Sequence, residues 1–284
     1  MRALVVEGGA MRGAYAAGAV AGLLRAGERF DAMYAASSGA CATAYLAAGQ
    51  LDSLRVWEEL HDGLIRPSNI LRAKPPLDLD FLFGDVCASR LPLDVDALRA
   101  SPAPLWVPLT DAQSLQVEYR DVRREEDPLA VLRAAAALPL AYGRAETLGG
   151  RRYFDGGMSD PIPVLRALRD GATDVTVVLT RPLGYRRRPN PAWLCHLAAR
   201  PYPEAHRVFA RFHERYNEAL DAVARPPPGV EVRAIAPPPR LRLRQFMRGV
   251  DDIRRAIEQG MRDATRAATS RSATFFLPEG NRRA

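Results

Sequence analysis

Hydrophobic positions in the first fifty residues form short runs that end at glycine or at other small residues. Residues 3–6 are one such run, and residues 30–35 are a second. Each is followed by a stretch of small and apolar residues, 12–26 after the first and 39–48 after the second, as expected of a helix packed closely on a sheet. Two strand–turn–helix units in succession favour a parallel α/β architecture.

The same alternation continues through most of the chain. We expect further strands at 105–108, 115–119, 152–154, 175–180 and 230–235, and helices at 51–61, 128–137, 164–169, 204–224 and 247–268. Residues 64–104 are less regular and rich in proline, which indicates a lid or an excursion over the site, and residues 181–191 form a polar excursion. Without a repeat or a low-complexity linker, we expect a single domain over 1–284. Its core would cover about 1–180, and a peripheral helical C-terminal part about 190–275.

Composition indicates a globular protein that can bury a sizeable core, with 48% hydrophobic and 26% charged residues. The three cysteines show no C-x-x-C spacing and the four histidines no metal-ligand pairing, which argues against a disulfide framework and a metal site. The longest weakly polar stretch, 13–24, is too short to span a membrane. Glu7 interrupts the first apolar run, which argues against a signal peptide. We therefore expect a cytoplasmic protein.

The net charge of +7 is carried almost entirely by arginine, because Lys74 is the only lysine. A basic surface suits acidic partners, although solubility alone would also explain it. Two groups of arginines lie beside aromatic residues: Arg186, Arg187 and Arg188 beside Tyr185, and Arg240, Arg242, Arg244 and Arg248 around Phe246 and Met247. These groups predict peripheral contact with an anionic membrane, and the alternative is a solvated run of charges. No nucleic acid is expected.

The first turn, "EGGAMRG", places three glycines and an arginine between a strand and a helix. A simple turn or close packing of strand on helix would need glycine here, and so would backbone N–H groups directed at a negative group. The phosphate-loop interpretation fails because Gly8 and Gly13 have the G-x-x-x-x-G spacing but Ala14 stands where lysine is required. The dinucleotide pattern G-x-G-x-x-G is absent as well.

The second turn, "AASSGA", carries a candidate nucleophile. Ser37 has Ala35 two positions before it and Gly39 two positions after it, a near match to the G-x-S-x-G turn on which catalytic serines sit. Ser38 would have Ala36 and Ala40 at those positions. The alternative is a serine that caps the following helix.

A candidate base for such a serine follows the strand expected at 152–154. Asp155 is followed by Gly156 and Gly157, and burial beside a serine would raise the pKa of its carboxyl. The alternative is an ordinary turn. The late histidines His196, His206 and His213 lie on stretches expected to be helical, which makes them poor candidates for a triad.

With these three motifs in this order, each after a strand, the sequence resembles the patatin-like phospholipase family, and in particular a bacterial subgroup of it. The family motif G-G-G-x-R/K-G is matched by Gly8, Gly9, Ala10, Met11, Arg12 and Gly13. The motif G-x-S-x-G is matched by Ala35, Ala36, Ser37, Ser38 and Gly39. The motif D-G-G/A is matched by Asp155, Gly156 and Gly157. The resemblance implies a three-layer α/β/α fold with a mostly parallel central sheet.

The resemblance also implies a reaction. Ser37 would attack an ester carbonyl while Asp155 accepts its proton, with no metal or organic cofactor. The loop of Gly8, Gly9, Ala10 and Gly13 would hold the oxyanion, and Arg12 would fix that loop or hold a phosphate. The substrate would be a phospholipid, a lysophospholipid or another acyl lipid.

Two departures from the family motifs leave an alternative open. Ala10 and Ala35 stand where the family has glycine. If Ala10 needs a positive φ, the conformation costs roughly 1–2 kcal/mol. The alternative is therefore a catalytically weakened relative that binds lipid or protein. A hydrolase that uses one of the late histidines is a further rival.

Overall fold

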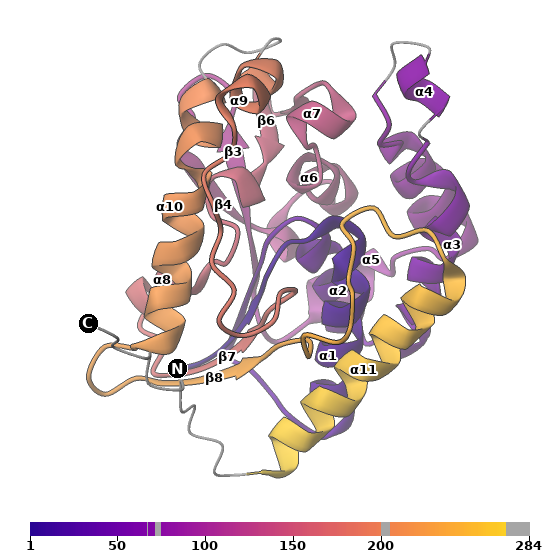
Figure 1. The fold of residues 1–284 in the computed structure, drawn as a ribbon. Coiled ribbons are helices and arrows are strands. Elements are labelled where there is room, and N and C mark those ends of the chain that lie inside the picture. The colour runs from indigo at the N-terminus through magenta and orange to yellow at the C-terminus, as the bar shows by residue number, and fades with distance from the viewer. Residues whose placement is uncertain (67, 72–74, 200–204, 271–284) are drawn as a thin grey trace, which may run out of the picture.

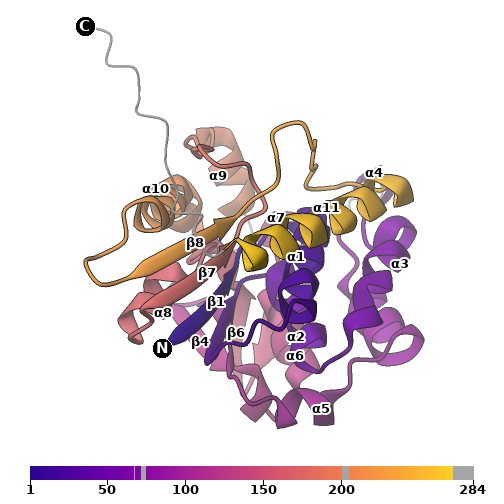
Figure 2. The same ribbon diagram turned by 90° about the horizontal axis from the view of Figure 1, so that it is seen from below.

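The computed structural model describes residues 1–66, 68–71, 75–199 and 205–270, and its centre is an eight-stranded sheet between two layers of helices (Figures 1 and 2). The strands are β1 (Arg2–Val6), β2 (Ala32–Ala35), β3 (Leu105–Asp111), β4 (Val117–Asp121), β5 (Glu146–Leu148), β6 (Arg151–Asp155), β7 (Asp174–Val178) and β8 (Glu231–Ile235). The helices are α1 (Gly13–Arg25), α2 (Ser38–Ala47), α3 (Arg55–Gly63), α4 (Ser68–Leu71), α5 (Val95–Ala100), α6 (Pro128–Ala135), α7 (Pro139–Tyr142), α8 (Val164–Arg169), α9 (Ala192–Ala199), α10 (Ala205–Ala224) and α11 (Val250–Thr269). The three-layer α/β/α fold expected from the sequence is confirmed.

The sheet is parallel on one side and antiparallel on the other. Its strand order is β5–β6–β3–β2–β1–β7–β8, with β4 paired to β3 as well. The pairs β3–β2, β2–β1, β1–β7 and β7–β8 are parallel, whereas β4, β5 and β6 join by antiparallel pairing. The mostly parallel sheet is therefore right, with an antiparallel end.

Strand β1 shows why the chain opens on an unbroken apolar run. Leu4 and Val6 belong to the hydrophobic cluster under α1, α2 and α11, while Ala3 and Val5 belong to the cluster under α8 and α10. A strand covered on both faces needs apolar residues at every position, not only at alternate ones.

The small residues of α1 allow α11 to lie directly on it, as Figure 2 shows. A side chain at Gly18 would overlap the carbonyl of Ile257, and one at Gly260 would overlap the carbonyl of Tyr15. The part of the chain expected to be a peripheral tail thus contributes β8 to the sheet and α11 to the packed core.

Most expected elements are found within a few residues of their predicted ends. The expected first residue of one helix, 204, lies outside the described residues, and α9 was expected only as a helical stretch around His196, without bounds. In the irregular segment 64–104 the structure has α4, a π-helical stretch over Phe81–Arg90 and α5. No helix in the described ranges is both long and apolar enough to cross a bilayer.

Candidate active site

The candidate site lies where strands β2 and β6 approach each other end to end beside β3. β2 runs parallel to β3 and pairs with it at Leu105 and Trp106. β6 runs antiparallel, and its last residue, Asp155, pairs with Leu109. The C-terminal ends of β2 and β6 therefore point at each other across two residues of β3.

Backbone hydrogen bonds place both strands on the same edge of β3. The N–H of Met33 in β2 donates to the carbonyl of Pro104, and the N–H of Ala112 donates to the carbonyl of Arg152 in β6. Pro104 and Ala112 are an even number of residues apart, so their backbone N–H and C=O groups face the same edge of β3. The backbone groups of the residues between these positions in the alternation face the other edge, where β4 pairs. The gap between the two strands lies opposite Pro108, which has no N–H to leave unpaired there.

Ser37 occupies the sharp turn after β2. Its backbone has φ 51° and ψ −128°, a strained conformation for a residue other than glycine. Its hydroxyl donates a hydrogen bond of 2.7 Å to Oδ2 of Asp155, 118 residues further along the chain. Ser37 is 7% exposed and Asp155 is 1% exposed. The structure thus brings together the two residues that sequence reasoning had placed in one unit.

The two glycines after Asp155 have different tasks. The N–H of Gly157 donates to Oδ1 of Asp155 at 2.7 Å, which fixes the carboxylate with its other oxygen toward Ser37. A side chain at Gly156 would overlap the carbonyl of Pro108 in β3. Burial raises the pKa of Asp155 to about 7, and the hydrogen bonds from Ser37 and Gly157 oppose that rise. A carboxylate with such a pKa can accept and return a proton near neutral pH.

In the glycine loop, several backbone donors already have partners. The N–H of Gly8 donates to the carbonyl of Pro161 at 3.2 Å, and the N–H of Gly9 donates to Oγ of Ser38 at 3.0 Å. Among the described residues, no hydrogen-bond partner is found for the N–H of Ala10 or of Ser38, the first residue of α2. These two donors, with the N-terminal end of α2 behind one of them, suit a developing negative charge.

The two departures from the glycine motifs differ in their structural cost. Ala10 has φ 49°, so the strain anticipated for it is present. Ala35 lies within β2 without a positive φ and is fully buried, so glycine is not required there.

Gly13 and Gly39 are needed for space. A side chain at Gly13 would come within 2.5 Å of the ring of Trp57, and one at Gly39 within 2.8 Å of the carbonyl of Glu7.

Arg12 is buried beside this loop at 5% exposure. Its Nε donates to Oγ1 of Thr180 at 3.4 Å, and its Nη1 is buried without a partner in the described part of the chain. Glu7 lies nearby, but its carboxylate accepts hydrogen bonds from the N–H of Thr180 and the hydroxyl of Tyr216, both at 2.6 Å. Burial raises the pKa of Glu7, and the charge of Arg12 opposes that rise.

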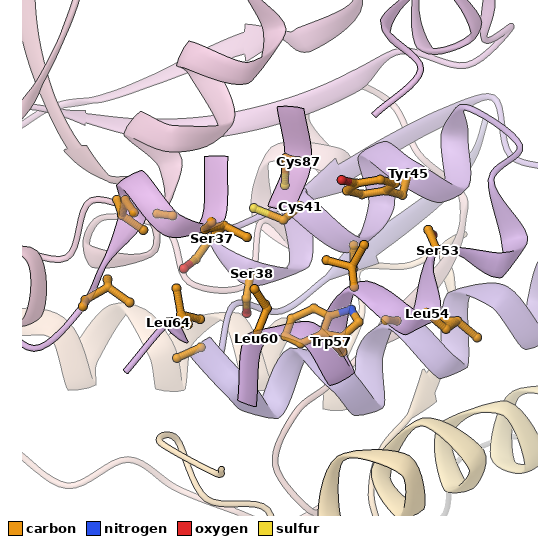
Figure 3. A pocket seen from close by; sticks show the side chains of 18 of the residues that line it. Ser37, Ser38, Cys41, Tyr45, Ser53, Leu54, Trp57, Leu60, Leu64 and Cys87 are labelled. Atoms are coloured by element: carbon orange, nitrogen blue, oxygen red, sulfur yellow. The ribbon is translucent and has the colours of Figure 1, made fainter. Parts of the chain in front are cut away.

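Two cavities meet at Ser37. The first, of about 60 Å³, is lined by apolar side chains of α2, α3 and the segment after α3. Figure 3 shows Ser37 near one end of it, followed along α2 by Cys41 and Tyr45, with Trp57 and Leu60 of α3 on the other side. The cavity-lining positions of α2 recur at helical spacing, so one face of this helix forms the wall.

The second cavity, of about 320 Å³, is also lined by Ser37. It is lined by the glycine loop, Arg12 and Asp155, by α7, and by C-terminal residues that include Arg187, Phe212 and Gln245. An apolar cavity and a more polar one that share a serine can separate the two halves of an amphipathic ester.

Neither cavity is lined by a histidine within the described ranges. His196 on α9 and His206 on α10 contact each other edge to face, with ring centroids 4.6 Å apart. No group of three or more potential metal ligands occurs among the described residues.

The sequence motifs give no indication of the C-terminal residues in the second cavity. Tyr216, Gln245 and Phe246 line it, and they come from α10 and the segment before α11. These residues could have been identified only by their long-range contacts with the glycine loop, and a single sequence does not show such contacts. The wall formed by Trp57 and Leu60 was visible only as an amphipathic helix.

The chain belongs to the patatin-like phospholipase family, whose model matches residues 4–168, more than half of its length. This is a family of esterase- and lipase-type hydrolases of lipids. A second family model, a domain of unknown function (DUF6363), matches residues 202–273. The bacterial subgroup stays a prediction.

Two individual proteins are similar. The uncharacterized protein YjjU of Escherichia coli (strain K12) is 28% identical over 253 residues, which cover 83% of this chain and 68% of that protein. Among solved structures, VipD from Legionella pneumophila aligns with 13% identity and a TM-score of 0.48. The alignment covers 94% of this chain and 66% of the VipD chain, less than two thirds of its length.

Proposed function

We propose that this protein is a serine acyl-ester hydrolase that acts on lipids through a Ser37–Asp155 dyad. The observation that carries the proposal is the 2.7 Å hydrogen bond from a buried, strained serine to a buried aspartate. Strain at a turn and a raised carboxyl pKa are both typical of catalytic sites, and here they occur on the two members of one hydrogen bond.

In the first half of the reaction, Oγ of Ser37 bonds to the ester carbonyl carbon while its proton passes to Oδ2 of Asp155. The carbonyl π electrons move to the oxygen and form an oxyanion. When this intermediate collapses, the C–O bond to the alcohol breaks, and the alcohol leaves with the proton from Asp155. In the second half, Asp155 takes a proton from water, which attacks the acyl-enzyme, and the proton returns to Ser37 as the fatty acid leaves.

The oxyanion would be held by the backbone of the glycine loop and the start of α2. The unpartnered N–H groups of Ala10 and Ser38 are the available donors, and the bond from Gly9 to Ser38 ties the loop to the helix. Gly8, Gly13 and Arg12 then shape the loop. One donor of this kind contributes about 3 kcal/mol or more to transition-state stabilisation.

The apolar cavity suits the acyl chain. A water needs roughly 10–15 Å³ of cavity space, so about 60 Å³ holds roughly four to six atoms of this size. A methylene is close in size to a water, so a chain of about four to six carbons fits without moving a wall. Longer chains require side chains of α3 or of the segment after it to move.

A fluorophosphonate probe tests the dyad without assuming a substrate. It should label the wild type at Ser37, label Asp155→Asn much more slowly, and leave Ser37→Ala unlabelled. Ser38→Ala removes the adjacent hydroxyl and the acceptor of the Gly9 N–H, and it should still be labelled at Ser37. Labelling mapped to Ser38, or an Asp155→Asn protein that reacts as fast as wild type, would contradict the mechanism.

The strain at Ala10 favours one alternative function, a weakened relative that binds lipid or protein without turning it over. Turnover of p-nitrophenyl butyrate separates the two. A protein whose hydrolysis does not exceed that of Ser37→Ala is the binding relative. If Ala10→Gly then restores turnover, the positive φ at this position is the cause.

We also propose that the mouth of the second cavity contacts an anionic membrane surface peripherally. Large apolar side chains are exposed around it: Leu140 and Phe246 on its lining, and Trp193 (67% exposed) and Leu197 on α9. The exposed Arg240, Arg242 and Arg244 lie close in sequence to Phe246, whereas Arg186 pairs with Asp221 and Met247 is buried. Trp193→Ala should weaken sedimentation with anionic liposomes, and equal sedimentation with neutral and anionic liposomes would remove the proposal.

A further inference from the structure

The second cavity is lined by more positive than negative side chains. Its charged lining residues are Arg12, Arg187 and Asp155. Asp155 is occupied by hydrogen bonds from Ser37 and Gly157. Two guanidinium groups therefore face a space whose one carboxylate is already engaged.

Neither arginine has an ion pair within 4 Å among the described residues. Arg12 is buried with Nη1 unpartnered, and the nearby Glu7 is held by other donors. Arg187 lies 4.5 Å over the ring of Phe212, and its Nη2 donates to Oδ1 of Asn190 at 3.3 Å. These contacts orient Arg187 without neutralising it.

The neighbouring arginine gives the contrast. Arg186 forms an ion pair with Asp221 on α10. Arg187 instead lines the second cavity.

The two cavity arginines also influence each other. Burial is the main cause that lowers the pKa of Arg12, Glu7 opposes it, and the charges of Arg181 and Arg187 lower it further. The guanidinium groups of Arg12 and Arg187 therefore repel each other, and a bound anion would offset that repulsion. Arginine is the side chain best suited to phosphate, because its planar fork donates two parallel hydrogen bonds.

We propose that Arg187 and Arg12 form a subsite for a phosphate group carried by the alcohol half of the substrate. The proposal rests on the proposed ester hydrolysis, since it assigns the second cavity to the leaving group. Arg187 lies outside residues 4–168, so the family match does not assign it. The enzyme should then prefer phosphate-bearing lipid esters to neutral ones with the same acyl chains.

Two short-chain substrates of equal acyl length test this preference below their micelle concentrations: dihexanoyl phosphatidylglycerol and dihexanoylglycerol. Wild type should hydrolyse the first with at least tenfold higher kcat/KM. Arg187→Gln should remove most of that ratio through KM and leave the neutral ester unchanged. Arg187→Lys keeps the charge and should retain part of the ratio. Arg207→Gln, an exposed change of equal charge on α10, is the matched control and should alter neither substrate.

A wild type without preference overturns the subsite, and so does an Arg187→Gln protein that loses both activities equally. The second result would mean that Arg187 only supports the structure.

Binding measured by calorimetry separates this proposal from the hydrolytic one. Full-length Ser37→Ala should bind dihexanoyl phosphatidylglycerol at least tenfold more tightly than Ser37→Ala with Arg187→Gln, even if no turnover of any ester is found. Inorganic phosphate and glycerol 3-phosphate should bind more weakly than the lipid. If inorganic phosphate binds as tightly as the lipid, the site serves a free phosphate and the assignment to the substrate is wrong.

Discussion

The two cavities that share Ser37 differ in their lining and in the origin of their walls. The apolar one is enclosed by α2, α3 and the segment after α3, all within the residues matched by the patatin model. The more polar one is completed by Arg187, Phe212 and Gln245, all beyond that match. Burial of each methylene on the apolar side contributes about 0.8 kcal/mol regardless of chemistry. In the proposed assignment the polar side discriminates by charge, so selectivity for the alcohol can vary while the acyl site stays the same.

The strongest test of this division acts where the cavities meet. Gly9→Val should lower kcat about 100-fold or more with little change in KM, because its side chain would come within 2.8 Å of Oγ1 of Thr180 and displace the loop donors. Steady-state kinetics with neutral and phosphate-bearing esters should show the same loss for both. A loss confined to one class would mean that the loop belongs to one cavity.

The pH dependence should also be common to both cavities. In the proposed mechanism Asp155 must be ionised to accept the proton, and burial raises its pKa to about 7. We expect kcat/KM to fall about tenfold per pH unit below 7 and to level off above it. The same midpoint for every acyl length and head group would identify the shared base, whereas a midpoint near 4 would point to a solvated carboxylate.

Filling the apolar cavity should affect only the acyl side. Ala42→Leu places three more carbons on the α2 wall, so the ratio of hexanoate to acetate ester hydrolysis should fall about tenfold. Ala47→Leu makes the same change on the same helix away from the cavity and should keep the wild-type ratio. A shift in head-group preference in Ala42→Leu would show that the cavities are not independent.

The smallest expected effect concerns stability. The pKa of the Asp155 carboxyl is raised from 3.8 to about 7 in the folded state. Its ionisation therefore lowers the free energy of unfolding as the pH rises from 3.8 to about 7, and the loss is complete above about pH 7. Asp155→Asn should therefore melt higher than wild type at pH 8, with a difference that shrinks toward pH 4. Thermal unfolding across this range measures it, and a constant difference would exclude the carboxyl as its source.

The sequence predicted well what local patterns determine. The buried strands, the turn at Ser37 and the Asp155–Gly156–Gly157 turn each depend on a few adjacent residues, and each lies where expected. The meeting of Ser37 with Asp155 followed from motif order and family resemblance. That β2 and β6 share an edge of β3 could not be predicted, because each strand's pairing with β3 is a long-range contact that leaves no local signal.

Other features needed the three-dimensional structure for similar reasons. The positive φ of Ala10 was considered only as a possibility, because the presence of alanine in a sequence does not determine the backbone angle at that residue. Arg187 had been grouped with Arg186 and Arg188 as surface charge. Which of three consecutive arginines points inward depends on the packing of α10.

The contact between α1 and α11 links two stretches that match different family models. Gly18 lies in the patatin match and Gly260 in the match of unknown function, and each occupies a place where a side chain would overlap the other helix's backbone. A recombination event that brought in one stretch with alanine at its glycine would force the helices apart. A chimaera between relatives should therefore keep both glycines, because each one makes room for the backbone of the other helix.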